Sequence, residues 1–328
     1  MAESVSGSWS YPRYLGASVS PISCINSLEG NPFETNRSVV NSSEVSGTET
    51  IVTASSECCK LIQLSDLHLQ ALAQQRYRDR DVEQQLLAVL GHIEQQHPDL
   101  DGLLLSGDLV HQGHSAAYRR LARYLERFDK PWYWIPGNHD SFQTMQRIRP
   151  AQPLNLRCNR WSIVLLDSTS AADGQGSGSL AESELRRLEE QLQICQKLKA
   201  ALLVVLHHNP MSVQSDWQDR IMLANADRLW ALLGRYKVQI TILFGHVHQQ
   251  WDLTQANVRV LGCPSTAVQF VMAQEQLLVE TEGAVALPGY RWLKLFSAGS
   301  NQEPNQQTNS TTANRFALET GVEWVCVD

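Results

Sequence analysis

The sequence predicts an α/β fold in which two mixed β-sheets face each other and helices cover their outer sides, a four-layer α/β/β/α sandwich. Between residues 61 and 244, short apolar runs alternate with amphipathic stretches of helical period. This alternation is typical of parallel strands that are buried on both faces and joined by helices. From about residue 249 to 295 the helical pattern stops, and the remaining short apolar runs indicate antiparallel strands.

The buried strands are predicted at residues 61–64, 103–105, 132–135, 163–166, 202–206 and 240–244. Amphipathic helices separate most of them, because apolar residues recur there every three or four positions. These stripes are Val82, Leu86, Leu90 and Ile93; Tyr118, Leu121, Leu125 and Phe128, with Ser115 as the cap; and Leu185, Leu188, Leu192 and Cys195. The later, helix-free part predicts strands at residues 258–261, 267–272, 277–279 and 291–296.

Polar segments divide the chain. Residues 1–56 are rich in Ser, Asn, Gly, Glu and Thr, and we expect a disordered extension because such a segment buries too little apolar surface. Residues 57–296 form the predicted domain, and residues 297–314 are a Gln- and Asn-rich linker or loop. Residues 315–328 regain apolar character and are expected to return as a final strand.

Composition excludes some classes of function. No apolar run reaches membrane-spanning length, and the amino end lacks the pattern of a secretory signal. A net charge of −7 argues against an extended nucleic-acid backbone as the main partner. The seven cysteines are scattered and odd in number, which favours a reducing cytoplasm, with Cys58 and Cys59 expected to be ordinary thiols.

Five polar motifs follow directly on apolar runs: Asp66-Leu-His68, Gly107-Asp108, Gly137-Asn138-His139-Asp140, His207-His208 and Gly245-His246-Val-His248. Asp, Asn and His are ligands for divalent metals, and no cysteine takes part. Because these residues come from the ends of apolar segments, we expect one metal centre along a single edge of the buried sheet.

Counting bonds predicts two ions. If the carboxylate of Asp108 bridges them, seven side chains supply four ligands to each ion. The seven are Asp66, His68, Asp108, Asn138, His208, His246 and His248. A two-metal centre binds a phosphoester and generates hydroxide at neutral pH. His139 lies beside a ligand, and with Asp140 to orient it, His139 can donate a hydrogen bond to phosphate or a proton to the leaving oxygen.

The motifs, in this order, resemble the calcineurin-like metallophosphoesterases over about residues 60–295. The segments 63–69, 136–140, 244–249, 264–270 and 289–291 resemble more closely the bacterial class III 3′,5′-cyclic-AMP phosphodiesterases. The resemblance implies a metallophosphoesterase-type sandwich that hydrolyses 3′,5′-cyclic AMP to 5′-AMP by metal-bound hydroxide, which lowers cellular cAMP. It also implies two divalent metal ions, with Fe(2+) favoured and Mn(2+) the alternative.

The resemblance further implies a role for each motif. Asp66, His68, Asp108 and His248 would hold the first metal, and Asp108, Asn138, His208 and His246 the second. The residues that would contact the phosphate of the nucleotide are His68, Asp108, Asn138, His139, His208 and His248.

Several alternatives stay open. The family's ligand histidine lies two residues before a proline, and counting back from Pro210 selects His208, with His207 as the alternative. His111 could border the site, but a role in a loop or helix cap is the preferred interpretation. Phe270 is explained by packing as well as by substrate contact.

The function also has alternatives. Instead of the cyclic nucleotide, the substrate could be another phosphodiester or a phosphomonoester, and a noncatalytic scaffold of the same fold is a third hypothesis. The expected partner is a small-molecule cyclic nucleotide rather than nucleic acid. The oligomeric state is left open, a homodimer included.

Overall fold

The computed structural model describes residues 48–297, apart from 54, 56 and 151, and residues 316–327. The expected disordered extension therefore lies mostly outside the described residues, as does almost all of the linker at 297–314. Where the extension is described, it ends in a strand, β1, that pairs in parallel with β5. Ile51, which follows this strand, is buried, so the last residues of the expected extension belong to the fold.

Two sheets form the centre of this compact unit. The seven-stranded sheet has the order β1-β5-β6-β7-β8-β10-β9, and the five-stranded sheet has the order β12-β11-β2-β3-β4. The strands are β1 (Thr48–Thr50), β2 (Cys58–Leu64), β3 (Gly102–Leu105), β4 (Trp132–Trp134), β5 (Asn155–Cys158), β6 (Trp161–Leu165), β7 (Ala201–Val205), β8 (Ile240–Phe244), β9 (Trp251–Gln255), β10 (Val258–Gly262), β11 (Gly289–Phe296) and β12 (Leu318–Trp324).

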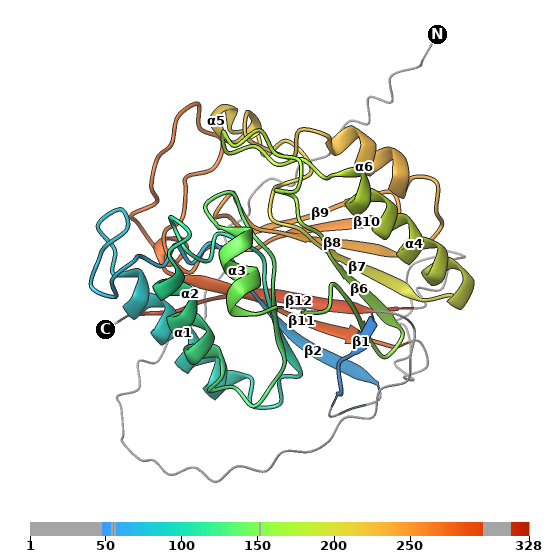
Figure 1. The fold of residues 1–328 in the computed structure, drawn as a ribbon, viewed down its shortest axis with the longest axis horizontal. Helices are drawn as coiled ribbons and strands as arrows, with labels where there is room; N and C mark the ends of the chain where they lie inside the picture. Colours follow the sequence, from blue (N-terminus) through green and yellow to red (C-terminus); the bar gives the residue numbers. More distant parts are fainter. Residues whose placement is uncertain (1–47, 54, 56, 151, 298–315, 328) are drawn as a thin grey trace. The chain divides into compact units, whose positions relative to one another are not determined.

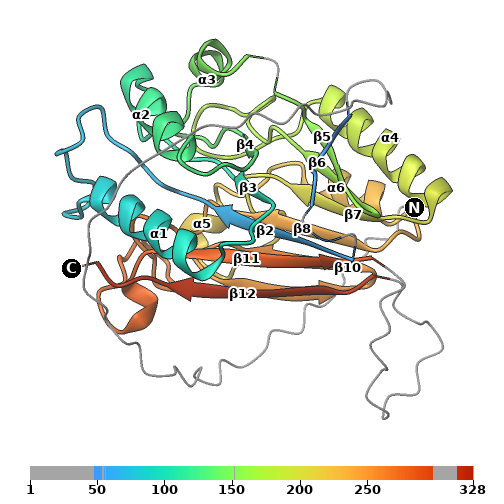
Figure 2. The same cartoon turned by 90° about the horizontal axis from the view of Figure 1, so that it is seen from below.

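Helices cover the outer sides of both sheets (Figures 1 and 2). They are α1 (Val82–Gln96), α2 (Ser115–Leu125), α3 (Phe142–Ile148), α4 (Glu182–Leu198), α5 (Asp216–Asp219) and α6 (Ala226–Leu233), with a short 3₁₀ turn at Ala284–Ala286. The apolar faces of α1 and α2 share one core with β2, β3 and β4. A second core lies between the sheets, where Leu61 and Leu104 of one sheet meet Leu203 and Leu243 of the other. The predicted four-layer α/β/β/α sandwich is confirmed.

Two segments that were predicted as strands lie in a loop instead. Residues 267–272 and 277–279 are not strands but parts of a long loop, joined only by an isolated bridge between Phe270 and Val279. Val268 and Phe270 are buried against the loop that follows β2, so their apolar character serves packing between loops rather than a sheet.

The carboxyl end of the chain closes the five-stranded sheet. β12 pairs antiparallel with β11 from Leu318 to Trp324. Its Glu323 accepts a hydrogen bond of 2.7 Å from the hydroxyl of Tyr290 on β11. The ring nitrogens of His92 and His97 each lie 3.0 Å from the same hydroxyl. These four side chains therefore connect α1 and the residue after it to the last two strands.

Cys59 is not the free thiol that the sequence analysis expected. It forms a disulfide with Cys158, with a Cα–Cα separation of 6.3 Å, and both residues are fully buried. Because Cys59 lies on β2 and Cys158 on β5, this covalent bond joins the two sheets. The sequence does not indicate this pairing, because the partner of Cys59 lies 99 residues away. No helix in the described ranges is both long enough and apolar enough to cross a bilayer.

Candidate metal centre

The five polar motifs meet at one end of both sheets. β2, β3 and β4 run parallel in one sheet, and β7 and β8 run parallel in the other. Each of these strands is followed by one motif, so the carboxyl ends of five strands deliver the side chains to one place. The sequence predicts this convergence at a single sheet edge, whereas in the structure the motifs come from the edges of two facing sheets.

The backbone at this place is unusual. Five residues of the motifs have positive φ angles between 46° and 69°, which non-glycine residues rarely adopt: Asp66, His68, Asp108, His246 and His248. Each such conformation costs about 1–3 kcal/mol, so the surrounding structure must hold it. Strain of this kind concentrated in adjacent turns is typical of a functional site.

One group of side chains surrounds His68. Its Nε2 lies 3.1 Å from Nε2 of His248, which in turn lies 3.4 Å from Oδ1 of Asp66. The opposite nitrogen of His248, Nδ1, bonds to the carbonyl of Val268 at 2.6 Å. That bond fixes the ring so that Nε2 faces the group, as in histidines that bind metals.

A second group surrounds His207. Its Nε2 lies 3.2 Å from Oδ1 of Asn138 and 3.4 Å from Oδ1 of Asp108. Its Nδ1 bonds to the carbonyl of Ser106 at 2.8 Å, which again orients the ring. The other oxygen of Asp108, Oδ2, lies 3.7 Å from Nε2 of His68. Asp108 thus presents one carboxylate oxygen to each group, as a bridging ligand would.

His246 completes the arrangement. Its ring lies 5.1 Å from that of His207, and its backbone N–H donates to the carboxylate of Asp66 at 3.1 Å. Its Nε2 is buried and finds no hydrogen-bond partner among the described residues. An unpartnered buried nitrogen is costly, and a bound cation would satisfy it.

The predicted ligand His208 makes contacts of its own with the protein. Its Nδ1 bonds to the hydroxyl of Ser168 at 2.7 Å, and its Nε2 lies 3.2 Å from the carbonyl of Gly176. Its ring stays near His246, at 4.6 Å between centroids, but both nitrogens are engaged by the protein. His207 is the histidine that faces Asp108 and Asn138. Counting from Pro210 could not separate two neighbours that point to different sides of the same segment.

The charges of the site favour bound cations. Burial lowers the pKa values of His68 and His208 well below the ordinary value, and those of His246 and His248 to about 3. These imidazoles are therefore neutral and keep a lone pair for a metal. Burial raises the pKa of Asp66 to about 7, whereas the pKa of Asp108 is held well below its usual range by His207 despite burial.

The residues present fit two divalent ions. Groups of three ligand atoms that lie within 4.8 Å of one another include Asp66–His68–His248 and Asp66–Asp108–His207. A third group, His207–His208–His246, brings His208 to the same distance although both of its nitrogens also contact the protein. Their donors are nitrogen and oxygen atoms, which suit iron, manganese, zinc or cobalt.

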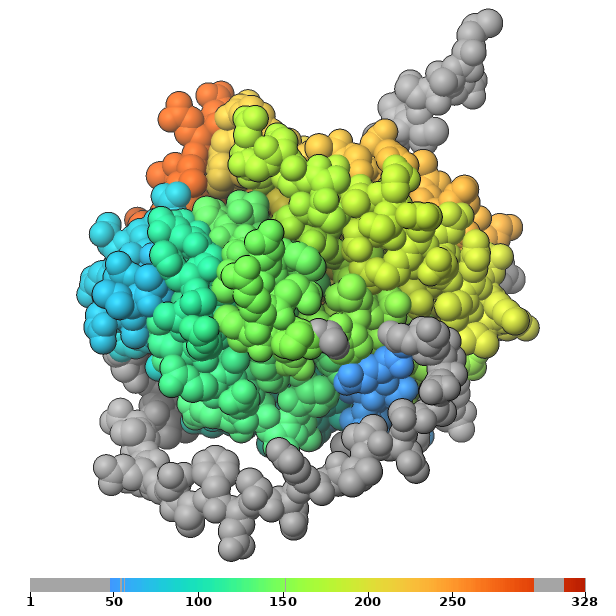
Figure 3. Space-filling view, in the orientation of Figure 1, coloured from blue at the N-terminus to red at the C-terminus, as the bar shows by residue number. Residues whose placement is uncertain are grey.

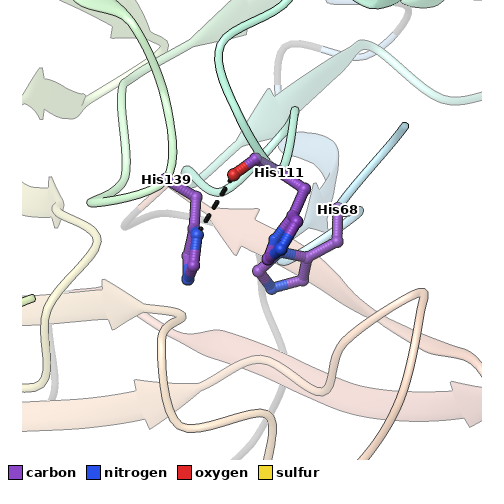
Figure 4. A group of neighbouring side chains, drawn as sticks. All are labelled: His68, His111 and His139. Carbon is purple, nitrogen blue, oxygen red and sulfur yellow. Dashed lines mark hydrogen bonds between the residues drawn. The ribbon is translucent and has the colours of Figure 1, made fainter. Parts of the chain in front are cut away.

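His139 lies at the open side of the centre, with its side chain 37% exposed and its Nε2 4.0 Å from Oδ2 of Asp108. Its Nδ1 lies 3.1 Å from the carbonyl of His111, and the two rings stack at 4.6 Å (Figure 4). His111 also places its Nδ1 3.3 Å from Nδ1 of His68. His111 therefore borders the site, and its position three residues after Asp108 is the sequence signal for this place.

Asp140 does not orient His139, contrary to the sequence expectation. Its carboxylate accepts hydrogen bonds from the backbone N–H groups of Leu109, Val110 and Gly137, at 2.9–3.0 Å, and from the hydroxyl of Tyr118 at 2.6 Å. Asp140 therefore joins the loops after β3 and β4. The carbonyl of His111 takes the orienting role that was assigned to Asp140.

Comparison with known proteins identifies the family. The sequence profile of the family Calcineurin-like phosphoesterase matches residues 59–250, more than half of the chain. The chain belongs to the calcineurin-like phosphoesterases. Two relatives of this phosphoesterase are a 3′,5′-cyclic-nucleotide phosphodiesterase of Nostoc sp., 35% identical over 73% of this chain and 89% of the relative, and the 3′,5′-cyclic adenosine monophosphate phosphodiesterase CpdA of Pseudomonas aeruginosa, 34% identical over 73% of this chain and 86% of the relative.

Solved structures agree on the fold. A dimetal phosphatase from Danio rerio superimposes with a TM-score of 0.54 at 12% identity, covering 73% of this phosphoesterase and 93% of that chain. At this identity the likeness concerns the fold alone. It supports two facing sheets as the frame that carries the ligand residues.

Proposed function

We propose that this phosphoesterase hydrolyses 3′,5′-cyclic AMP to 5′-AMP and so lowers cellular cAMP. The observation that carries the proposal is the position of Asp108, whose two oxygens face two separate groups of ligands while the exposed ring of His139 lies beside them. The match to this chain covers more than four fifths of the length of each relative named for cyclic-nucleotide hydrolysis, which supports the same substrate class here.

Two ions would be held by two ligand sets that share Asp108. The first set is Asp66, His68, Asp108 and His248, and the second is Asp108, Asn138, His207 and His246. We thus assign to His207 the role that the sequence suggested for His208. When bound, such ions lower the pKa of water and neutralise the phosphodiester. We propose Fe(2+) for this site, with Mn(2+) as the alternative.

The chain's own residues would orient the substrate and move a proton. The carbonyl of His111 accepts a hydrogen bond from Nδ1–H of His139, so Nε2 points toward the centre, and in the protonated ring this nitrogen carries the second N–H, which can donate to the phosphate or give its proton to the leaving oxygen. The amide of Asn138 and the rings of His68, His207 and His248 line the position that the phosphate would take. The buried His208 supports this wall through Ser168.

We propose that this phosphoesterase acts in the cytoplasm, because the substrate proposed for it is a small signalling nucleotide. Disulfides are uncommon there, so the Cys59–Cys158 bond bears directly on this point. Thiol labelling of the protein from intact cells would show whether these two cysteines are oxidised. A reduced pair agrees with the cytoplasm, and a fully oxidised pair argues for another compartment.

A substrate panel tests the proposed activity. Protein loaded with Fe(2+) or Mn(2+) is assayed with 3′,5′-cyclic AMP, 3′,5′-cyclic GMP, an aryl phosphodiester and an aryl phosphomonoester. We expect metal-dependent release of 5′-AMP. Hydrolysis of the aryl esters without any hydrolysis of cyclic AMP would favour a phosphoesterase with a different substrate. Metal binding without hydrolysis of any ester would favour a noncatalytic scaffold.

A further inference from the structure

A strained turn lies between β2 and α1, close to the metal centre. The backbone of Tyr77 and Arg80 is joined by two hydrogen bonds of 3.0 Å, and the residues between them, Arg78 and Asp79, have φ angles of 46° and 64°. Two consecutive positive φ angles are characteristic of a type I′ turn, where Asn-Gly is the usual sequence. An arginine in this conformation costs conformational energy, so other contacts of the turn must offset that cost.

Tyr77 fixes the turn to the site. Tyr77 is only 8% exposed and belongs to a small core with Val82, Val268 and Phe270. The ring of Tyr77 stacks on that of His68 at 4.4 Å, and the ring of Phe270 stacks on that of His248 at 4.2 Å. Two aromatic rings therefore lie directly against two histidines of the first ligand set.

Arg78 lies across these two rings. Its guanidinium carbon is 5.4 Å from the centroid of Tyr77 and 5.6 Å from that of Phe270, and its Nε donates to the hydroxyl of Tyr77 at 3.2 Å. The side chain is exposed, and the described residues place no carboxylate within ion-pairing distance of it. The planar cation is thus supported by aromatic rings while remaining accessible to a ligand.

A row of rings connects Arg78 to the catalytic side of the centre. Tyr77 lies 4.7 Å from the ring of His111, and His111 stacks on His139. Figure 4 shows His111 between His139 and His68, and in Figure 3 the cyan segment around residue 75 lies at the same edge of this face as the orange segment around residue 275. A substrate whose phosphate lies beside His139 can extend along this row toward Arg78.

We propose that Arg78 is the residue on which the nucleobase of the substrate stacks. This inference rests on the proposed function and adds the part of the site that distinguishes a nucleotide from any other phosphodiester. Guanidinium planes stack on bases, and every base has a π-face, so stacking does not depend on which base is present. Arg78 contacts the rings of Tyr77 and Phe270, which in turn stack on His68 and His248. The base of a nucleotide whose phosphate lies at these histidines would therefore extend toward Arg78. The phosphodiesterase would therefore accept cyclic AMP and cyclic GMP alike.

The test compares substrates with and without a base. Wild type, Arg78→Ala, Arg78→Lys and the matched control Arg80→Ala, which removes the same charge from the same turn, are loaded with Mn(2+). Each is assayed with cyclic AMP, cyclic GMP and a methyl riboside 3′,5′-cyclic phosphate that lacks the base. Binding of 5′-AMP and of ribose 5-phosphate is measured by calorimetry as a readout independent of turnover.

We expect Arg78→Ala to raise KM about tenfold for both cyclic nucleotides, which is within the range for one lost base stack, and to leave kcat nearly unchanged. The substrate without a base should show no change, and 5′-AMP should lose its advantage in affinity over ribose 5-phosphate. Arg78→Lys should resemble Arg78→Ala because it keeps the charge but lacks the plane. Arg80→Ala should behave as wild type.

Three outcomes would overturn the inference: an equal loss for the substrate without a base, full activity of Arg78→Lys, or unchanged KM in Arg78→Ala. Failure of the proposed function is distinguishable, because wild type itself would then hydrolyse neither cyclic nucleotide.

Discussion

Nε2 of His207 lies 3.4 Å from Oδ1 of Asp108, deep in the protein, where neither side chain contacts solvent appreciably. This contact supports our proposal that His207 belongs to the second ligand set. It also raises the pKa of His207 to about 9 despite burial, because the carboxylate of Asp108 stabilises the protonated ring. A cation of either kind, a proton or a metal ion, is therefore favoured at this position.

The two histidines predict different consequences of substitution. His207→Ala removes a ligand, so we expect the protein to bind one metal equivalent fewer and to lose nearly all activity. His208→Ala removes only the bonds to Ser168 and Gly176, so two metal equivalents should remain. Elemental analysis of both variants after loading and desalting checks this prediction. If His208→Ala lost a metal equivalent and His207→Ala did not, His208 would be the ligand.

His139→Ala should separate catalysis from metal binding. Its ring lies at the open side and is not needed by either ligand set, so the metal content should stay at the wild-type level. Loss of a positioned proton donor should lower kcat by about a hundredfold to ten-thousandfold. His114→Ala, which changes an exposed histidine on the connection between β3 and α2, serves as the control and should keep full activity. Near-normal turnover of His139→Ala would refute the role of proton donor.

The disulfide predicts a stability difference. Replacing Cys59 and Cys158 together by Ala should lower the free energy of unfolding by about 2–5 kcal/mol, because the bond closes a long loop of chain. Denaturant titration with and without a reductant measures this: wild type should weaken when reduced, and the double variant should not respond. Cys58→Ala, which removes an unpaired neighbouring thiol, should match wild type. Equal stability of reduced and oxidised wild type would contradict the prediction.

We expect the free energy of unfolding to depend on pH through the ionisation of Glu323. Burial raises its pKa, but hydrogen bonds from His97 and Tyr290 outweigh burial and hold the pKa below the ordinary 4.5. The stability that Glu323 contributes is therefore complete above pH 4.5 and is lost as the pH falls through the lowered value. Burial lowers the pKa of His92 below 6.5, so acid also opposes folding there.

Glu323→Gln should thus be less stable than wild type by about 1–2 kcal/mol at pH 7.5, and the difference should shrink below pH 4.5. Thermal unfolding across this pH range measures the effect. Glu319→Gln, an exposed residue on the same strand, is the matched control. A difference that stays constant down to pH 3 would show that ionisation of Glu323 contributes nothing.

The sequence predicted the sandwich because its central strands are continuous apolar runs, and burial on both faces of a sheet imposes that pattern. It missed β1, β5 and β9, which are short and partly polar. It also assigned strands to the loop around Phe270, whose apolar residues pack against Tyr77. The ligand-rich motifs were recognisable because metal chemistry restricts residue type. The choice between His207 and His208, the backbone role of Asp140 and the place of Arg78 depend on side-chain direction and long-range contacts, which spacing along the chain does not encode.

The pairing of β11 has a consequence for the order of folding. β11 lies between β2 and β12, and its partner residues on β2 lie far back in the sequence, as the pairing of Arg291 with Gln63 shows. Because pairing between distant segments is slow to form, β2, whose end carries Asp66 and His68, is expected to gain its second neighbouring strand late in folding. A substitution that weakens the pairing of β11 with β2 should therefore delay assembly of the ligand sets as well as of the sheet.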